Sequence, residues 1–421
     1  MHGTNGVKEL IWSPTSSTNI DILRKSKKCL EFSSGGCLEM KIGLFGFTFA
    51  HENMGCQALT CAFLGILSRL FPEKRIRVID FHEENSLGLI PGIFPDFEFE
   101  LYKINLKKDF FGFIRKLNEC DFLFDESYGD GFSDIYFTRS VFRHTIIKIL
   151  AGESRTPFIL TPQTYGPFDN KLLKWLAGRA IRKATKAYSR DSTSAEFAKN
   201  ISGREINSVT DLAFGLNIEN IVSNARNLGI NVSGLLWQGG FNGATNQFHL
   251  QVDYRQYIKT IIEYGLNNGF SVHLIPHVTQ SYNEGRIIPD SDFVVCHELA
   301  AKYPDTNLAP MFKSPYEAKR YISAMGIFVG ARMHATIAAF STGVITIPFA
   351  YSRKFKGLYD DIGYPHYIDG TKLSTEDAVE QTIKIIEKQT KYSELQKQSM
   401  NNIRELFDRF ELELFTFLQN K

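Results

Sequence analysis

The sequence IFVGARMHATIAAFSTGVITIPFAYSRKFKGLYDDIGY, from Ile327 to Tyr364, contains the clearest α/β unit in the chain. Its first apolar run, Ile327–Val329, predicts a buried strand that ends in a sharp turn at Gly330. The next helix should begin near Arg332 and end at Gly343, which takes the role of a C-terminal cap. A second apolar run follows directly and predicts another strand. A strand, a turn, a helix and a strand in this order are typical of a parallel α/β sheet.

Two cationic side chains, Arg332 and His334, flank Met333 at the predicted start of this helix. Ligands gather at the carboxyl ends of parallel strands, and unpaired helix N–H groups attract anions. Because Ser, Thr, Asp and Asn are missing at the cap position, these N–H groups are left for a ligand. Arg332 can bind a carboxylate or phosphate through two hydrogen bonds, and His334 can exchange a proton near neutral pH. Lys354 could add a third cation to this predicted anion site. Alternatively, Arg332 pairs with a surface acid and His334 is a satisfied first-turn histidine.

Length and composition narrow the class of protein. A chain of 421 residues suggests two α/β domains of ordinary size. The net charge of +2 gives no argument for nucleic-acid binding, so an anionic substrate must meet local basic groups. The six cysteines form no C-x-x-C pair, which indicates reduced thiols and argues against a structural zinc site. No apolar run is long enough to span a bilayer, and no signal-peptide pattern is visible, so we expect a cytoplasmic protein.

The alternation of strands and helices predicts five regions. Two Rossmann-like halves should face each other across a cleft, which is the architecture of GT-B-like proteins. We find no internal repeat of solenoid period. Residues 84–106 look irregular, and the second half should restart with a strand at Val232–Trp237. Short strands are predicted at Phe122–Asp125 and Lys186–Ser189, and Ser314 before a proline indicates the start of a helix. No residue pattern indicates an oligomeric state. The regions are an extension of little order at 1–40, an N-terminal domain at 41–215, a linker at 216–230, a C-terminal domain at 231–390 and a C-terminal helix at 391–421.

Polar or glycine-bearing loops follow four predicted strands of the N-terminal half, and they contain Asn53, Asp130, Gln163 and Arg190. His277 follows a strand of the second half. Such loops meet at one edge of a doubly wound sheet and form a cleft there. The dinucleotide motif G-x-G-x-x-G and the Walker motif are both missing. Two alternatives remain: the Asn53 loop is a helix-capping turn, and Arg190 pairs with the acidic residue that follows it.

The ordered set of these motifs resembles the polysaccharide pyruvyl transferase family. The resemblance runs from about Lys41 to Gly363 and is strongest near the C-terminus. The motifs that carry it there are Gly330-x-Arg332-Met333-His334, Ser341-x-Gly343, Tyr351-x-x-Lys354-x-x-Gly357 and Asp361-x-Gly363. Upstream motifs support it, namely Asn53-x-Gly55-x-Gln57-Ala58-Leu59, Gly129-Asp130-x-Phe132-x-Asp134, Pro162-Gln163-x-Tyr165-Gly166-Pro167, Arg190-Asp191, Asp211-x-Ala213-Phe214 and Pro276-His277-Val278.

The resemblance implies transfer of the pyruvyl group of phosphoenolpyruvate to a sugar, usually as a ketal across two hydroxyls. This chemistry needs a carboxylate clamp, a phosphate cradle and an acid or base, with phosphoenolpyruvate as co-substrate and no cofactor or metal. We expect Arg332 and Arg190 to hold the donor's negative groups from opposite halves. His334 would donate the proton or bind the phosphate, with the N–H groups around Met333 and the side chain of Lys354 in support.

The acceptor should lie against the N-terminal loops. It would be a sugar or a lipid-linked oligosaccharide, so peripheral association with the inner face of a membrane is compatible with the sequence. Two other functions remain open: a nucleotide-sugar glycosyltransferase, and a non-catalytic carbohydrate-assembly protein with the same fold. The candidate acceptor residues are Asn53, Asp130, Gln163 and His277, with Tyr128 or Tyr165 stacking on the sugar.

Overall fold

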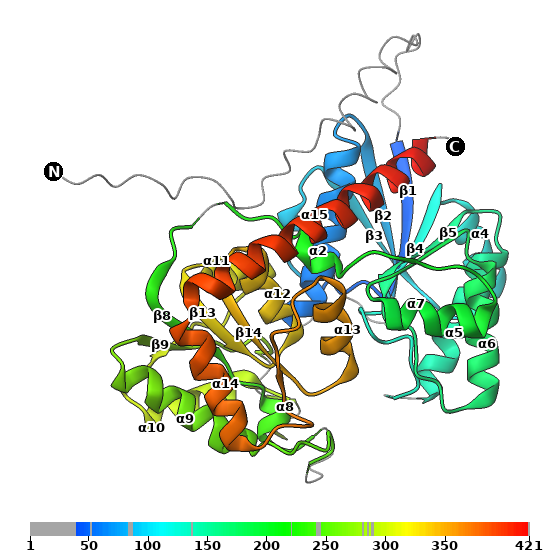
Figure 1. Cartoon of the computed structure of the whole chain (residues 1–421). Helices are drawn as coiled ribbons and strands as arrows, with labels where there is room; N and C mark the ends of the chain where they lie inside the picture. The colour runs from blue at the N-terminus through cyan, green and yellow to red at the C-terminus, as the bar shows by residue number, and fades with distance from the viewer. Residues whose placement is uncertain are drawn as a thin grey trace.

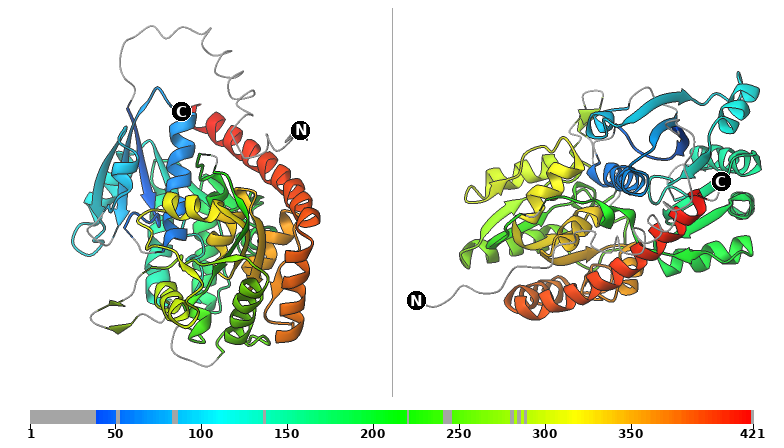
Figure 2. Two further views of the ribbon diagram at one scale, coloured as in Figure 1. Left: turned by 90° about the vertical axis from the view of Figure 1, so that its left-hand side faces the viewer. Right: turned by 90° about the horizontal axis from the view of Figure 1, so that it is seen from above.

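The computed structural model describes residues 39–50, 53–82, 87–135, 138–219, 221–240, 246–279, 282–283, 286–287 and 290–419. Within these residues the chain forms two α/β domains that lie next to each other (Figures 1 and 2). The predicted fold class, with two Rossmann-like halves, is confirmed. The predicted extension at 1–40 lies outside the described residues except for its last two.

The N-terminal domain is built on a seven-stranded sheet with the order β3-β2-β1-β4-β5-β6-β7. Neighbouring strands pair in parallel throughout. Strands β2 and β3 are added on one side of β1, and β4 to β7 are added on its other side. The boundary between β1 and β4 is therefore a topological switch point, where open parallel sheets form ligand crevices. The strands are β1 (Glu39–Phe45), β2 (Arg75–His82), β3 (Phe97–Lys103), β4 (Phe122–Asp125), β5 (Phe158–Gln163), β6 (Lys186–Ser189) and β7 (Asn207–Ser208).

Apolar side chains distribute the N-terminal helices between the two faces of this sheet. Phe113, Val141 and Leu176 belong to one buried cluster and place α4, α5 and α6 on the same face. Phe63 and Leu67 belong to a second cluster and place α2 on the opposite face. The helices are α2 (Met54–Leu70), α3 (Ile90–Ile93), α4 (Phe110–Asn118), α5 (Thr138–Glu153), α6 (Lys171–Lys183) and α7 (Ser192–Ser202), followed by the 3-10 helix η1 (Leu212–Gly215).

The C-terminal domain has a six-stranded parallel sheet with the order β12-β9-β8-β13-β14-β15. Its strands are β8 (Asn224–Asn231), β9 (Ser271–Leu274), β12 (Asn307–Leu308), β13 (Met325–Gly330), β14 (Ile345–Ala350) and β15 (Ile368–Asp369), and β10 (Tyr282–Asn283) and β11 (Arg286–Ile287) form a separate hairpin. Its helices are α8 (Gly234–Trp237), α9 (Tyr254–Asn267), α10 (Asp292–Lys302), α11 (Pro315–Ser323), α12 (Met333–Ser341), α13 (Arg353–Asp361) and α14 (Thr375–Glu387).

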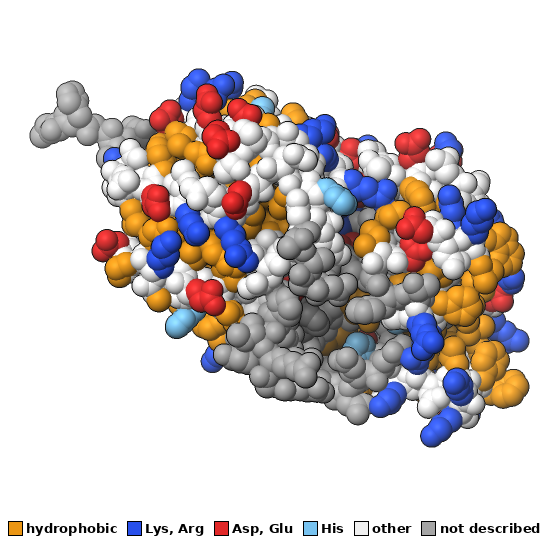
Figure 3. Space-filling model, turned by 90° about the horizontal axis from the view of Figure 1, so that it is seen from below, with side chains coloured by type: hydrophobic (Ala, Val, Ile, Leu, Met, Phe, Trp, Pro, Cys, Tyr) orange, Lys and Arg blue, Asp and Glu red, His pale blue; other side chains and the backbone are white. Residues whose placement is uncertain are grey.

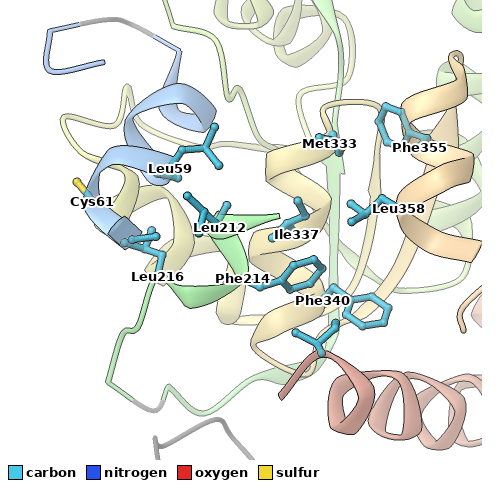
Figure 4. Packing of buried hydrophobic residues seen from close by; sticks show 14 of the residues in the cluster. Leu59, Cys61, Leu212, Phe214, Leu216, Met333, Ile337, Phe340, Phe355 and Leu358 are labelled. Atoms are coloured by element: carbon cyan, nitrogen blue, oxygen red, sulfur yellow. The ribbon is translucent and has the colours of Figure 1, made fainter. Parts of the chain in front are cut away.

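The two domains share one apolar core. Figure 4 shows Leu59 of α2 beside Leu212 and Phe214, and these residues lie next to Ile337 and Phe340 of α12. The rings of Phe214 and Phe340 meet edge to face at 6.2 Å between centroids. This shared burial of apolar surface fixes α2 against α12, and so it fixes the loop between β1 and α2 against the turn after Gly330.

The last helix, α15 (Gln389–Gln419), connects the domains a second time. Near its start, Gln396 donates to the carbonyl oxygens of Phe340 and Val344 at 3.0 and 2.8 Å. Towards its end, Phe410 packs on Tyr188 of β6, with ring centroids 5.0 Å apart. Figure 1 shows this helix, in red, lying across both domains.

Three predictions about the elements were wrong. Residues 84–106 were predicted to be irregular, but β3 (Phe97–Lys103) forms the edge of the sheet. The linker predicted at 216–230 contains most of β8, whose first three residues are exposed and therefore look polar in sequence. The strand predicted for Val232–Trp237 does not form. Two residues follow β8 there, and the short helix α8 then begins.

Candidate active site

Helix α12 begins as the sequence predicted, directly after β13 and without a side-chain cap. Arg332 occupies the N-cap position, and its backbone N–H donates to Oδ1 of Asn231 at 2.9 Å. Met333 is the first helical residue and is buried in the shared core. This arrangement places His334 in the first turn of α12, at the carboxyl edge of the C-terminal sheet.

The guanidinium of Arg332 is held by two carboxylates of its own domain. Nε and Nη2 donate to Asp292 Oδ1 at 3.0 and 2.7 Å, and Nη2 also donates to Asp290 Oδ1 at 2.5 Å. Asp292 is fully buried and also accepts the backbone N–H groups of His277 and Val278, both at 3.1 Å. Arg332 therefore pairs with acidic side chains, but the alternative of a surface pair is wrong, because Asp292 is fully buried. Contact between Arg332 and the donor stays a prediction.

His334 and Arg190 meet at one carboxylate, Asp211. Asp211 Oδ2 lies 3.0 Å from Arg190 Nη1 and 3.5 Å from His334 Nε2. Burial alone would raise the pKa of Asp211, but His334 and Arg190 outweigh it and lower the pKa to about 2. The carboxylate therefore stays ionised at neutral pH between one side chain from each domain. The alternative pairing of Arg190 with its neighbour is wrong, because Asp191 caps α7 by accepting from the Ser194 N–H.

Arg190 is itself nearly fully buried, at 2% exposure. Its Nη2 has no hydrogen-bond partner among the described residues. A buried guanidinium nitrogen without an acceptor is costly, so such groups are normally satisfied by a ligand or by water. Arg190 thus offers an unused donor at the boundary between the domains.

Glu126 and Gln163 contribute further unsatisfied atoms to this region. Both oxygens of Glu126, and Oε1 of Gln163, are buried without a hydrogen-bond partner in the part of the chain that is described. Burial, followed by the charge of Asp211, raises the pKa of Glu126 well above its usual value. Burial therefore favours the protonated, neutral form of Glu126. Glu126 was not predicted, although it forms a visible acidic pair with Asp125 at the end of β4.

An ion pair joins the two domains close to this cluster. Lys354 Nζ of α13 lies 2.8 Å from Asp130 Oδ2 on the loop after β4. Cys56 lies near the same groups, and burial, followed by the charges of Asp130 and Glu126, raises its thiol pKa to about 12. Cys56 is consequently a thiol at neutral pH and is a poor nucleophile.

The start of α2 reaches His334 from the opposite domain. Asn53 caps α2 by accepting the Gly55 N–H at 2.9 Å, so the interpretation of this loop as a helix cap is confirmed. A Cβ on Gly55 would lie only 2.3 Å from His334 Nδ1. His277 is buried beside this contact, and the Met54 N–H donates to its carbonyl oxygen. Burial first, then the charges of His334 and Arg332, lower the pKa of His277 to about 3, so it is neutral.

The two predicted sugar-stacking residues have different surroundings. Tyr165 is fully buried and donates to the Tyr188 carbonyl oxygen at 2.9 Å, so the prediction that it stacks on a sugar is wrong. Tyr128 is half-buried and lines a small cavity with His82, His144 and Lys148. Its φ of 56° is in the left-handed region, which is unusual for a tyrosine and often occurs at functional sites.

The structure therefore brings most of the predicted residues to one place. Within the described residues, no group of three or more His, Cys, Asp or Glu side chains is arranged to hold a metal ion. Asp211 and Asp292 organise the site. Asp211 stands in one of the motifs but was not predicted as a site residue, and Asp292 is the first residue of α10, where an acidic residue is ordinary and gives no signal. The predicted residues that gather at the domain boundary are Arg190, His334, Lys354, Asp130, Gln163, Asn53 and His277, with Arg332 and Met333 at the adjoining helix start.

Comparison with solved structures shows the class of this fold. The putative UDP-N-acetylglucosamine 2-epimerase of Listeria monocytogenes aligns with a TM-score of 0.53 at 10% identity, over 86% of this chain and 91% of that one. The UDP-GlcNAc 2-epimerase of Neisseria meningitidis, bound to UDP-GlcNAc, gives 0.53 at 12% identity, over 89% and 100%. A ugt transferase from Siraitia grosvenorii, in complex with UDP, gives 0.51 at 10% identity, over 89% and 99%. The protein has the GT-B-like fold, with two Rossmann-like domains and residues of both at the candidate site.

The family follows from the sequence itself. Residues 53–353 match the model of the polysaccharide pyruvyl transferase family. The chain belongs to this family, as the motif set predicted. No protein with curated annotation matches the chain.

Proposed function

We propose that this protein transfers the pyruvyl group of phosphoenolpyruvate to a sugar of a polysaccharide or its precursor and forms a ketal. The observation that supports this proposal most is the chain Arg190–Asp211–His334, which links the two domains through a buried carboxylate. Arg190 Nη2, next to this buried carboxylate, has no hydrogen-bond partner among the described residues. Phosphoenolpyruvate carries a phosphate and a carboxylate, and arginine side chains bind both kinds of group.

Each residue of the site has a role in this proposal. Arg190 and Lys354 bind the negative groups of the donor from opposite domains, and the N–H groups at the start of α12 bind the phosphate. Arg332 holds this helix start in place through Asp292 and contacts the donor if the ion pair rearranges. Burial raises the pKa of Glu126, and this favours the neutral form, which would not repel the donor.

The reaction consumes one molecule of donor and two hydroxyls. His334 gives a proton to the methylene carbon, which makes the neighbouring carbon electrophilic. One sugar hydroxyl attacks this carbon and loses its proton, and the bond to phosphate then breaks. A second hydroxyl attacks the same carbon, loses its proton and closes the ketal ring. Of the two protons that the hydroxyls release, one returns to His334 and the other goes to the departing phosphate. The products are the ketal and inorganic phosphate.

The acceptor lies on the N-terminal side in this proposal. Asp130 and Tyr128 belong to the loop after β4, and Tyr128 lines a cavity at the carboxyl edge of the sheet. An aromatic ring and a carboxylate are suitable for contacts with the face and the hydroxyls of a sugar.

A transfer assay with a natural acceptor tests the proposal. The purified protein would be incubated with phosphoenolpyruvate and with polysaccharide and lipid-linked oligosaccharide fractions from a strain that lacks the gene. We expect acid-labile pyruvate in one fraction and equimolar phosphate release. The His334→Ala variant should form neither product above background. Transfer at a near-normal rate by this variant would disprove the role of His334 and the proposed site.

A further inference from the structure

Exposed apolar side chains are concentrated on one part of the N-terminal domain. Nine large hydrophobic residues are exposed among the described residues, and six of them lie at or near the starts of α4, α5 and α6. Phe111 is 86% exposed and Trp175 is 56% exposed, which is unusual for such large rings. We call this set the docking edge; it consists of Phe110, Phe111, Ile135, Phe142, Leu172 and Trp175.

The topology places the docking edge on the same side of the sheet as the candidate active site. Each of α4, α5 and α6 follows a strand of an all-parallel sheet, so each helix starts at the carboxyl edge. These helices also form one layer, since their buried residues share one cluster. Figure 3, which views the molecule from below, shows hydrophobic side chains between Lys and Arg side chains over the N-terminal domain.

Basic residues surround the docking edge at the N-terminal ends of its three helices, where a positive charge makes a helix less stable. Lys107 and Lys108 precede α4, Arg139 lies in the first turn of α5, and Lys171 and Lys174 lie in the first turn of α6; all five are exposed. A helix dipole disfavours positive charge at the N-terminus and favours acidic residues there. The first turns of all three helices contain no acidic residue. The exposed acidic residues described at these helix starts are Asp109 and Asp169.

We propose that the docking edge binds the surface of an anionic lipid bilayer. Phe and Trp rings partition into the interfacial region of a membrane, and each nearby Lys or Arg adds about 1 kcal/mol of attraction to anionic headgroups. A protein partner would more often meet apolar residues without a surplus of one charge. Among the described helices, none is long and apolar enough to cross a membrane, so the contact is peripheral.

Docking in this orientation turns the carboxyl edge of the N-terminal sheet towards the lipid surface. The active site would then face acceptors carried on lipids, such as a lipid-linked oligosaccharide. This identification of the acceptor class rests on the proposed function, whereas lipid binding by the docking edge does not.

Vesicle co-sedimentation of the full-length protein tests the proposal. We expect it to bind vesicles of phosphatidylcholine with phosphatidylglycerol much better than vesicles of phosphatidylcholine alone, and to bind less as salt rises. The double variant Phe111→Ser with Trp175→Ser should bind about tenfold less, and so should Lys107→Glu with Lys108→Glu. Thermal unfolding should hardly change, because all four side chains are exposed.

The control replaces exposed apolar residues elsewhere, Val222→Ser with Met311→Ser, which should bind vesicles like the wild type. Equal binding by all variants, or no binding to anionic vesicles, would overturn the proposal. Sedimentation velocity gives a further check: a wild-type dimer that becomes a monomer in the docking-edge variant would show that a second copy covers this surface instead. Phosphoenolpyruvate binding by the docking-edge variants should equal that of the wild type, so failure of lipid docking is distinguishable from failure of the proposed function.

Discussion

Arg332 and Arg190 are both buried arginines paired with carboxylates, yet their surroundings differ. Arg332 contacts two acidic side chains, and one of them also holds the loop after β9. Arg190 contacts one carboxylate and keeps an unsatisfied nitrogen. The hydrogen bonds of Arg332 therefore serve mainly to stabilise its own domain, whereas Arg190 still has a donor that a ligand can use.

The first prediction follows from this difference. Arg332→Met leaves Asp290 and Asp292 without their cation, and removal of one partner of a buried pair costs about 3–5 kcal/mol. We expect the free energy of unfolding in urea to fall by this amount. Adding Asp292→Asn should restore part of it, because the buried charge is then removed as well. Wild-type stability together with lost phosphoenolpyruvate binding would instead show that Arg332 contacts the donor directly.

Glu126 makes the stability of the protein depend on pH. Its raised pKa means that the native state binds more protons than the unfolded state above the ordinary glutamate pKa of about 4.3. The free energy of unfolding therefore falls as pH rises from that value towards the raised pKa, and this contribution is fully present only at lower pH. In Glu126→Gln the contribution is removed, so the fall between mildly acidic and neutral pH should be smaller. Identical pH profiles in urea titrations would contradict a raised pKa for Glu126.

At this scale the sequence predicted which residues gather, but not which atoms pair. The motifs indicated Arg190, His334 and Lys354, because cations at strand ends meet at one sheet edge. Asp211 lies 21 positions from Arg190 and Asp290 lies 42 positions from Arg332, so these pairs depend on the packed tertiary structure. Tyr165 looked like a loop aromatic, but its hydroxyl is satisfied by a buried carbonyl.

Helix α2 of the N-terminal domain packs directly against His334 of the C-terminal domain, and so helps to set the position of this side chain. Its second residue, Gly55, lies against His334, so the missing Cβ decides how closely the helices approach. The same helix contains Gly65, where a Cβ would meet Arg69 Nη1 at an ordinary distance of 3.6 Å. The two glycines form a matched pair for an experiment.

Gly55→Ala should displace His334 and reduce pyruvyl transfer about tenfold or more, because small misplacements at a catalytic centre are costly. Gly65→Ala should keep full activity and raise the free energy of unfolding by about 0.5–1 kcal/mol, as expected for alanine in a helix. Transfer rates and urea unfolding of both variants provide the check. Equal activity of the two variants would show that the Gly55 contact does not position His334.

Most elements could be predicted because their residues have the required period and end signals. Strands β4 and β6 have the predicted bounds, and Asn53 and Ser314 cap helices as expected. Strand β3 was missed because it lies at the sheet edge and most of its residues are only partly buried. Strand β8 was placed too late, because its first half is exposed and polar.

The whole molecule is held together in ways that do not depend on the donor site. The shared core around α2 and α12 and the crossing of α15 join the domains through apolar contacts. The pair Asp130–Lys354 also joins them, but both side chains are partly exposed, at 26% and 23%. Pairs with this exposure contribute little to stability, about 0–1 kcal/mol.

The variant Lys354→Met therefore tests phosphoenolpyruvate binding with little effect on the free energy of unfolding. We expect a change of less than about 1 kcal/mol in the free energy of unfolding. Phosphoenolpyruvate affinity should nevertheless fall by about tenfold, because a cation of the proposed donor site is lost. Chemical denaturation and calorimetry on the same preparation measure both quantities. An unchanged affinity would remove Lys354 from the donor site.

The most direct test of the central claim is calorimetric titration of the full-length protein with phosphoenolpyruvate, with UDP-N-acetylglucosamine as the comparison ligand. We expect the wild type to bind phosphoenolpyruvate and Arg190→Gln, while still folded by circular dichroism, to bind it at least about tenfold more weakly. Binding of the nucleotide sugar without any binding of phosphoenolpyruvate would rule out the proposed donor site.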